Sequence, residues 1–335
     1  MNLAIAVLMD PIEAIKVAKD STLAMLLEAQ RRGHVSHYLQ QGGLEIRDGE
    51  PWGLLCPVTV RDDPADWFTL GPAAWHPLGK MDVILARKDP PVDAQFQHDT
   101  LVLELTQHAP SGSRKPLVVN TPQALRDCNE KLYAMQFPQC IPPTLVARDA
   151  DELRRFVATH EEVVLKPLDG MGGRGIFRVR AGDTNVNSML ETLLGPEGRF
   201  VMAQKFIPAI SAGDKRILLI DGEPVPYALA RIPREGEFRG NLAAGGCGKG
   251  VPLSERDRWI VEQVAPDLRR RGLLFVGLDV IGDWLTEINV TSPTCIRELD
   301  AQFGLNIAGQ LFDAIEARVT DGDGSRDPGP GTRDP

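Results

Sequence analysis

The sequence lacks an excess of positive charge and a long apolar run, and each absence excludes a class of protein. The formal net charge is −9, whereas a nucleic-acid surface needs clustered lysine and arginine. The apolar stretch at residues 3–9 has no cationic segment before it and ends at Asp10-Pro11, which is typical of a first buried strand and not of a signal peptide or membrane span. We therefore expect neither nucleic-acid nor membrane partners.

A paired-cysteine framework is also missing. The five cysteines, Cys56, Cys128, Cys140, Cys247 and Cys295, are odd in number and contain no Cys-x-x-Cys pair, which favours free thiols in a reducing cytoplasm. No histidine lies near Cys295 in the sequence to activate it, so we do not expect a catalytic thiol.

The 335 residues allow about two domains, and the first is predicted to be an open α/β sheet. A helix should follow the N-cap at Asp20-Ser21 and end at Gly33, and Asp48-Gly49 predicts a hairpin turn. Strands are expected at 3–9, 34–39, 44–47, 83–87 and 117–120, and a further helix at 94–108.

Two loops leave strand ends of this sheet, where open α/β sheets bind ligands. The loop at 9–13 contains Asp10, and the segment 87–91 begins with Arg87, which can hold a carboxylate. A Pro-Pro pair that only stops a strand is the alternative for 87–91.

The second region is predicted to be α+β with largely antiparallel strands. Thr121-Pro122 should begin a helix that runs to about residue 136. Strands are expected at 144–147, 163–166, 176–180, 200–205, 216–220 and 225–230, and helices at 149–160, 254–271 and 306–319. Residues 320–335 are rich in Gly, Pro and Asp and are expected to be disordered.

Residues 273–297 combine a hairpin pattern with oxygen-bearing side chains. A two-residue loop at Gly282-Asp283 would pair Leu278 with Glu287, whereas a three-residue loop that includes Trp284 pairs Asp279 with Glu287. We expect the second register, because it gives one apolar face and one polar face carrying Asp279, Glu287 and Asn289. Mg²⁺ prefers such oxygen ligands, although a solvated hairpin face would show the same spacing.

Residues 170–175 match Gly-x-Gly-x-x-Gly, but the period-two pattern that follows predicts a strand where a dinucleotide fold needs a helix. The glycines are therefore expected to form a flap whose N–H groups approach a polyphosphate; a glycine-rich turn without a ligand is the alternative. Cations recur around it in an otherwise acidic chain, as a triphosphate site requires: Lys131, Lys166, Arg174, Lys215, Arg216, Arg231 and Arg239. Residues 232–249, rich in glycine, are expected to be a mobile lid.

Ordered blocks of the chain resemble one known family. MDPI, AMLLEAQRRG, RKDPP, RDCNEKL, LKPLDGMGG, GDKR, DGEPVPYALARIP, RGNLAAGG, FVGLDVIGD and LTEINVTSPTCIRE are together similar to the bacterial type of glutathione synthetase, an ATP-grasp ligase. The resemblance runs from residue 1 to about residue 319. It implies an N-terminal pre-ATP-grasp α/β domain at 1–122 and an ATP-grasp region at 123–319. That region would divide into a central subdomain (123–205) with the flap and a C-terminal subdomain (206–319) with the hairpin.

The resemblance also implies roles for residues of this chain. Contacts to ATP fall on Lys131, Lys166, Gly170, Gly172, Gly173, Gln204, Lys205, Phe206, Ile207, Asp214 and Asn289. Metal ligands fall on Asp279, Glu287 and Asn289. Catalytic arginines are Arg216, Arg231 and Arg239. Substrate contacts fall on Asp10, Arg87, Asn241, Ser292, Pro293, Thr294 and Cys295.

The implied reaction joins γ-glutamylcysteine to glycine with ATP and Mg²⁺ or Mn²⁺, through an acyl phosphate, in a cytoplasmic homotetramer. One departure is Cys247, where the family has a basic residue. Another ATP-grasp carboxylate–amine ligase and a non-catalytic ATP-binding module remain alternatives.

Overall fold

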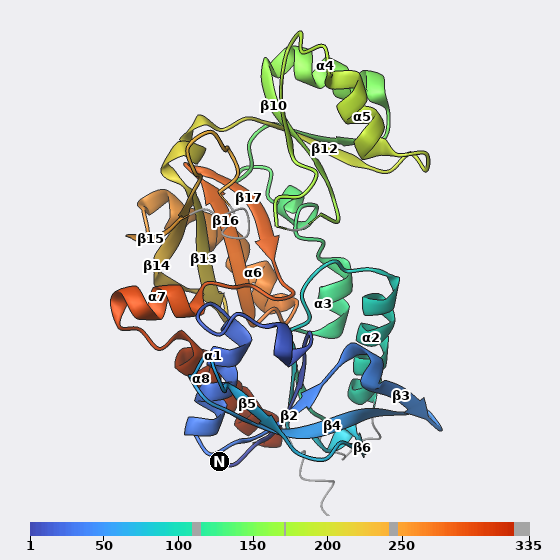
Figure 1. The fold of residues 1–335 in the computed structure, drawn as a ribbon, viewed down its shortest axis with the longest axis vertical. Coiled ribbons are helices and arrows are strands. Elements are labelled where there is room, and N and C mark those ends of the chain that lie inside the picture. Colours follow the sequence, from blue (N-terminus) through green and yellow to red (C-terminus); the bar gives the residue numbers. More distant parts are fainter. Residues whose placement is uncertain (109–114, 171, 241–246, 325–335) are drawn as a thin grey trace, which may run out of the picture.

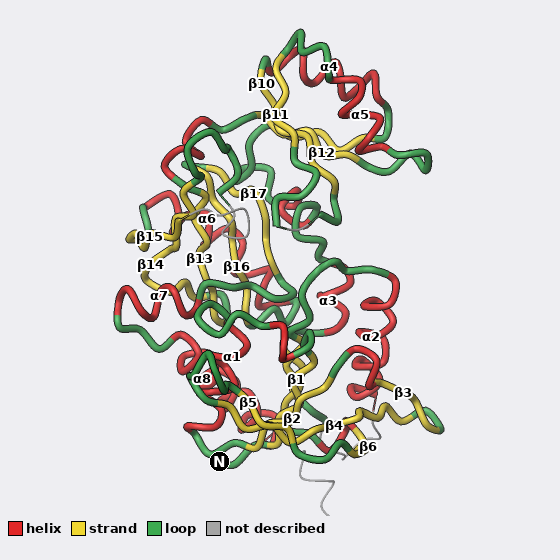
Figure 2. The backbone as a smooth tube through the Cα atoms, in the orientation of Figure 1, coloured by secondary structure: helices red, strands yellow, loops and turns green. Residues whose placement is uncertain are grey.

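Three sheets follow one another along the long axis of the molecule (Figure 1). The computed structural model describes residues 1–108, 115–170, 172–240 and 247–324. An eight-stranded sheet lies at the bottom of the view, a five-stranded sheet in the middle and a four-stranded sheet at the top (Figure 2). The mixed α/β class expected from the sequence is confirmed.

The first sheet has a parallel centre covered by helices on both faces. Its central order is β2-β1-β7-β8, formed by β1 (Ala4–Leu8), β2 (Val35–Leu39), β7 (Val83–Ala86) and β8 (Leu117–Val119). One face packs on α1 (Ser21–Arg31) and α8 (Ile307–Gly324), the other on α2 (Ala94–Leu105) and α3 (Pro122–Asp127). The predicted N-cap is present, because the Asp20 carboxylate accepts from the Leu23 N–H at 2.6 Å.

Antiparallel strands extend this sheet at one edge: β3 (Leu44–Arg47), β4 (Glu50–Val60), β5 (Phe68–Leu70) and β6 (Ala74–Pro77). Asp48 and Gly49 form the expected hairpin turn between β3 and β4, with φ of 49° and 83°, the positive values that a type I′ turn requires. Strands β5 and β6 were not predicted, since they are too short to show a clear alternation.

The four-stranded sheet is antiparallel, in the order β11-β10-β12-β9. It consists of β9 (Thr144–Ala147), β10 (Glu162–Pro167), β11 (Phe177–Arg180) and β12 (Val201–Lys205). Helices α4 (Ala150–His160) and α5 (Val186–Leu194) bury Leu153, Val157, Leu190 and Leu193 against it. Helix α5 was not predicted.

The five-stranded sheet, in the order β15-β14-β13-β16-β17, lies between the other two. Its strands are β13 (Asp214–Ile220), β14 (Glu223–Ile232), β15 (Cys247–Pro252), β16 (Phe275–Ile281) and β17 (Trp284–Asn289). Helix α6 (Glu255–Arg270) packs on one face and α7 (Ile296–Phe303) on the other. The bounds of the predicted lid, 232–249, were wrong at both ends, because Ile232 belongs to β14 and residues 247–249 belong to β15, which pairs with it. Residues 241–246 lie outside the described part, and the mobility of the segment stays a prediction.

The helix expected from Pro122 to residue 136 is interrupted. Helix α3 ends at Asp127, and a 3-10 turn at Tyr133–Gln136 follows an irregular segment. The Asn129 side chain accepts from the N–H groups of Lys131 and Leu132, at 3.1 Å each, a local bond that competes with helix continuation. The Glu130 carbonyl instead accepts from the Ile288 N–H at 2.8 Å, so the segment lies along the free edge of β17.

The last helix also differs from its prediction, because α8 continues to Gly324 where disorder was expected from residue 320. Residues 325–335 of the expected tail lie outside the described part. Helix α8 returns to the first sheet, where it contacts the residues between α1 and β2. Arg32, the C-cap of α1, pairs with Asp313 at 2.7 Å, and the His34 side chain forms a hydrogen bond with Glu316 at 3.0 Å.

Candidate active site

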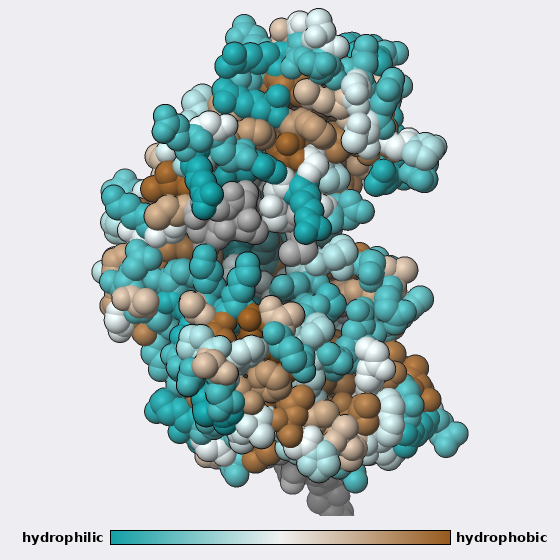
Figure 3. Space-filling view, in the orientation of Figure 1, coloured by the Kyte–Doolittle hydropathy of each residue, from teal (hydrophilic) through white to brown (hydrophobic). Residues whose placement is uncertain are grey.

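A cavity of about 300 Å³ lies between the four-stranded and five-stranded sheets. The space-filling view shows the molecule hollowed between the module that carries α4 and α5 and the body below it (Figure 3). Apolar side chains of Val164, Ile176, Ile210 and Ile281 line the cavity next to the segment 204–207. The rest of the lining is dominated by charged and polar groups, so one end of the site suits a flat apolar ligand group and the other suits anions.

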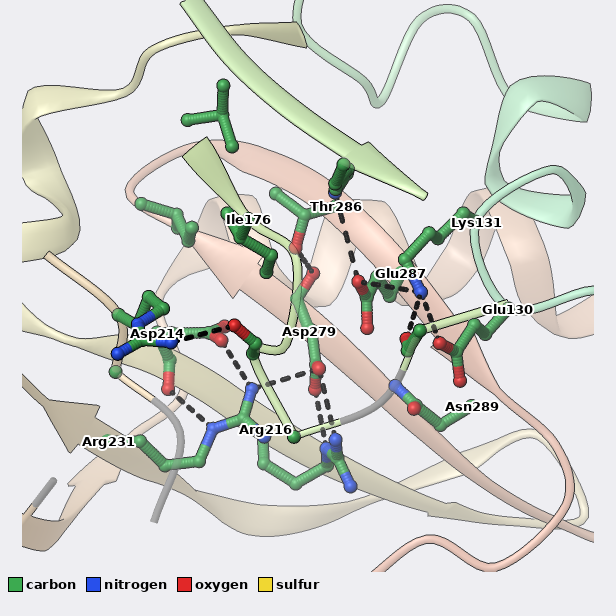
Figure 4. A pocket seen from close by; sticks show the side chains of 18 of the residues that line it. Glu130, Lys131, Ile176, Asp214, Arg216, Arg231, Asp279, Thr286, Glu287 and Asn289 are labelled. Carbon is green, nitrogen blue, oxygen red and sulfur yellow. Dashed lines mark hydrogen bonds and ion pairs between the residues drawn. The ribbon is translucent and has the colours of Figure 1, made fainter. Parts of the chain in front are cut away.

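The hairpin of β16 and β17 sets three oxygen-bearing side chains on the cavity side (Figure 4). Asp279 pairs with Glu287, and Gly277 pairs with Asn289, the predicted register. The predicted three-residue loop was wrong, because Trp284 pairs with Ile281 and leaves a two-residue turn at Gly282-Asp283. The register shift falls between Asp279 and Val280, where the bulge at Thr286 supplies the extra residue.

Two arginines hold Asp279. Arg216 contacts both carboxylate oxygens, at 2.5 and 3.0 Å, and Arg231 contacts Oδ2 at 2.9 Å. Strand pairing explains the approach, since Arg216 on β13 lies directly opposite Asp279 on β16. Burial alone would raise the pKa of Asp279, but Arg216 and Arg231 outweigh it and hold that pKa well below its usual range.

Asp214 extends this buried charge cluster. Its Oδ2 accepts from Arg231 Nη2 at 2.5 Å, while its Oδ1 is buried with no hydrogen-bond partner among the described residues. Burial raises the pKa of Asp214 to about 7, against the opposing effect of Arg231. A buried acceptor that lacks a donor, on the cavity wall, is a position for a ligand group that can donate.

Two buried lysines approach Glu287 from the other side. Lys131 Nζ lies 3.6 Å from the Glu287 carboxylate and Lys166 Nζ 3.8 Å from it. Lys131 donates to the Glu130 carboxylate and to the carbonyl of Gly170, the latter at 2.9 Å; Lys166 donates to Gln204 Oε1 at 3.3 Å. Burial lowers the pKa of Lys166, whereas Glu287 and Glu130 outweigh burial and raise that of Lys131.

The glycine segment connects β10 to β11, as expected, and contributes Gly170, Gly172 and Gly173 to the cavity wall. Gly172 and Gly173 have φ of 65° and 80°, a conformation that favours glycine. Arg239 donates to the Gly173 carbonyl at 2.9 Å and pairs with Glu237 at 2.5 Å.

The segment after β17 contributes Ser292, Thr294 and Cys295 to the cavity lining. Cys295 is fully buried, with φ of 93°, a strained conformation for a side-chain-bearing residue. Burial raises the pKa of its thiol, which disfavours a nucleophilic thiolate. All five cysteines are free.

Most of the site residues predicted from the sequence meet in this cavity, but Asp10, Arg87 and Pro293 do not line it. Asp10 accepts from the Asp89 N–H and pairs with Lys88, both at 2.8 Å, and so braces the loop after β7. Arg87 is buried and donates to the Pro293 carbonyl at 3.0 Å; neither Arg87 nor Pro293 lines the cavity. Asn241 lies outside the described residues.

Lys215 of the predicted cationic set is also elsewhere, paired with Asp257 at the start of α6 at 2.5 Å. Sequence reasoning missed Glu130, Thr286 and the apolar wall. The wall residues on strands could have been found from their period-two alternation. Glu130 gave no signal, since it was assigned to a helix.

The donor set suits a hard divalent cation. Glu287 and Asn289 face the cavity together, and Asn289 donates through Nδ2 to the Gly277 carbonyl at 3.3 Å, which leaves its oxygen for a ligand. Within residues 1–108, 115–170, 172–240 and 247–324, no three His, Cys, Asp or Glu side chains gather to hold a metal. The pair of Glu287 and Asn289 fits Mg²⁺, which usually takes one or two protein carboxylates and completes its shell with phosphate and water.

Two family models together match most of the chain. Residues 3–126 match the model for the N-terminal domain of prokaryotic glutathione synthetase, and residues 130–304 match the model for its ATP-grasp domain. The glutathione synthetase of Xanthomonas axonopodis pv. citri is 63% identical over 317 residues, covering 95% of this chain and 99% of that protein. That of Pseudomonas aeruginosa is 56% identical over 319 residues, with coverage of 95% and 99%.

Solved structures share the fold at low sequence identity. D-cycloserine synthetase DcsG superposes with a TM-score of 0.63 at 15% identity, over 94% of this chain and 99% of that one. The ATP-grasp ligase PsnB, in a complex with a precursor variant, Mg and ADP, gives 0.60 at 17% identity, over 95% and 99%. Within the described part of the chain, no helix combines the length and apolar character that a membrane span needs.

Proposed function

Because the chain belongs to the prokaryotic glutathione synthetase family, we propose that the cavity between its two antiparallel sheets is where ATP, γ-glutamylcysteine and glycine are joined into glutathione. The observation that supports this location is the convergence of Lys131, Lys166, the glycine flap, Glu287 and Asn289 on one cavity. A nucleoside triphosphate needs this combination of cations, backbone N–H groups and metal ligands.

The nucleotide would lie along the upper wall. Its base would contact Val164, Ile176 and the segment 204–207, which includes Gln204, Lys205, Phe206 and Ile207. Lys131, Lys166 and the flap N–H groups of Gly170, Gly172 and Gly173 would hold the phosphates. Asp214, with its unpartnered Oδ1, would accept a hydrogen bond from the nucleotide.

Glu287 and Asn289 would hold Mg²⁺ or Mn²⁺, with Asp279 beside them. When bound, the cation neutralises charge that develops on the transferring phosphoryl group. The Asp279 carboxylate already forms ion pairs with Arg216 and Arg231. Its role would therefore be to hold those two guanidinium groups in place at the site. Arg216, Arg231 and Arg239 then face the anionic oxygens of the substrates.

The reaction proceeds in two steps, phosphoryl transfer and then amide formation. The cysteinyl carboxylate oxygen attacks the γ-phosphorus of ATP, the bond to the bridging oxygen breaks, and ADP leaves. The neutral amine of glycine then attacks the acyl carbon, phosphate leaves with the electron pair of the C–O bond, and the amine loses a proton. The segment Ser292–Cys295, supported from below by Arg87, would position the dipeptide, and Asp10 would act by bracing the neighbouring loop.

Phosphate release tests the proposed function. Little phosphate should appear with γ-glutamylcysteine alone or glycine alone, and rapid release should require both, with one glutathione formed per ATP. Equal release with another amino acid acceptor would indicate a different carboxylate–amine ligase. ATP binding without release under any of these conditions would indicate a non-catalytic module.

Cys295→Ser should retain ligation, because the acyl phosphate is the activated species and no enzyme thiol takes part. We expect turnover within about tenfold of the parent protein and a raised KM for γ-glutamylcysteine, since the side chain lies at the dipeptide end of the cavity. Steady-state rates at varied dipeptide concentration measure both. Complete inactivity in a folded variant that still binds ATP and dipeptide would contradict the mechanism.

We further propose that the protein is cytoplasmic, which its free cysteines favour. We also propose that it forms a homotetramer, because known members of the family it resembles include homotetramers. Light scattering of the purified protein tests the assembly.

A further inference from the structure

Glu130 is a cavity residue to which nothing above assigns a role. Its backbone is fixed, because its carbonyl accepts from the Ile288 N–H of β17 at 2.8 Å and the following residues are held by the Asn129 side chain. The carboxylate therefore projects next to Glu287 and Asn289 (Figure 4), with 18% of the side chain exposed.

The Glu130 carboxylate accepts a hydrogen bond from the Lys131 ammonium group, and this contact determines the direction in which Lys131 points. Lys131 is 2% exposed, so its charge must be met by protein groups or a ligand. Its hydrogen bonds go to Glu130 and to the Gly170 carbonyl. The Glu287 carboxylate, at 3.6 Å, is the next acid within reach but lies beyond hydrogen-bonding distance.

Removing the negative charge of Glu130 would change this balance. A buried ammonium that loses its anion turns to the nearest remaining one, and here that is Glu287. The same carboxylate oxygens would then be shared between Lys131 and any cation held by Glu287 and Asn289. Lys166 is restrained in a similar way, since it donates to Gln204 and lies 3.8 Å from Glu287.

We propose that Glu130 is a positioning residue that holds Lys131 away from Glu287 and so keeps the Glu287 carboxylate free to bind a divalent cation. The proposal rests on the proposed metal site. It assigns Glu130 no direct contact with the metal or with the substrates.

The test measures Mn²⁺ affinity directly, from the electron paramagnetic resonance signal of the free ion, at ADP concentrations that saturate each protein. Glu130→Gln keeps the shape of the side chain and should weaken Mn²⁺ binding about tenfold, in the range of coupling between neighbouring charged groups. In a Lys131→Met background the same Glu130→Gln change should have an effect of no more than about twofold, because the competing ammonium is gone. Glu223→Gln, an exposed acid paired with Arg269, is the matched control and should leave the affinity unchanged.

The outcomes separate the possible roles. An unchanged affinity in Glu130→Gln overturns the proposal, and so does an equal loss with and without Lys131, which would mark Glu130 as a ligand in its own right. If Glu287→Gln leaves Mn²⁺ binding intact, the metal site itself is wrong. Thermal unfolding checks that each variant is folded; if Glu130→Gln is not, Glu130→Asp, which keeps the charge on a shorter side chain, should show a smaller loss of the same sign.

Discussion

Glu287→Gln is expected to lower the rate of ligation by about 10²-fold or more, because the transferring phosphoryl group loses part of its counterion at the moment its charge is greatest. The substitution removes one charge with little change of shape. It also removes the negative charge that lies 3.6 Å from Lys131 and 3.8 Å from Lys166. Steady-state turnover at saturating ATP, dipeptide and glycine, measured over a range of Mg²⁺ concentrations, gives the size of the effect.

Glu223→Gln again serves as the control, since Glu223 is exposed at the far end of β14 from the cavity and should not affect turnover. High Mg²⁺ should restore part of the activity of Glu287→Gln if weaker metal binding contributes to the loss. A folded Glu287→Gln protein with full turnover at ordinary Mg²⁺ would rule out the assignment of Glu287.

The hairpin that carries Glu287 shows how far sequence reasoning reaches. Alternation along both arms was enough to predict that Asp279 faces Glu287, because one face had to be apolar. It could not separate a three-residue loop from a two-residue turn followed by a bulge, since both shift the pairing by one residue. The structure has the bulge, with Thr286 donating to the Asp279 carbonyl at 3.1 Å.

The partners of Asp279 could not be read from local spacing. Asp279 was interpreted as one of three oxygen ligands of a metal, which stays a prediction; what its spacing could not show is that β13 and β14 bring Arg216 and Arg231 against it. Those contacts join residues 63 and 48 positions away in the chain, and they depend on which strands are neighbours. The alternation of a single hairpin contains no information on that order.

The segment around Glu130 was mispredicted for a similar reason. Its composition allows a helix, and only the free edge of β17, more than 150 residues later, offers the N–H group of Ile288 to the Glu130 carbonyl. A long-range hydrogen bond together with the Asn129 side chain outweighs a weak local preference. The site residue was missed because the backbone that presents it is not helical.

Arg231→Met is expected to cost about 3–5 kcal/mol of stability, the usual penalty for leaving a buried charge without its partner. Arg231 is 4% exposed and contacts Asp214 at 2.5 Å and Asp279 at 2.9 Å. Asp279 keeps Arg216 in the variant, but Asp214 loses its ion-pair partner, and its Oδ1 already lacks a donor among the described residues. Urea unfolding followed by circular dichroism measures the loss. Arg269→Met is the control, because its pair with Glu223 is exposed and should contribute no more than about 1 kcal/mol.

The loss in Arg231→Met should also depend on pH in a direction that identifies its cause. In the parent protein the two arginines hold the pKa of Asp279 below its usual range, so this pairing stabilises the fold above about pH 4. That stabilisation is lost as the pH falls through the folded-state pKa.

Burial already raises the pKa of Asp214 to about 7, and removing Arg231 should raise it further. Asp214 in the variant can then take up a proton below neutral pH and relieve its own buried charge. The difference in unfolding free energy between the two proteins should therefore be larger at pH 8 than at pH 5.5. An equal difference at both pH values would mean that the loss comes from packing of the arginine side chain and not from the charge it compensates.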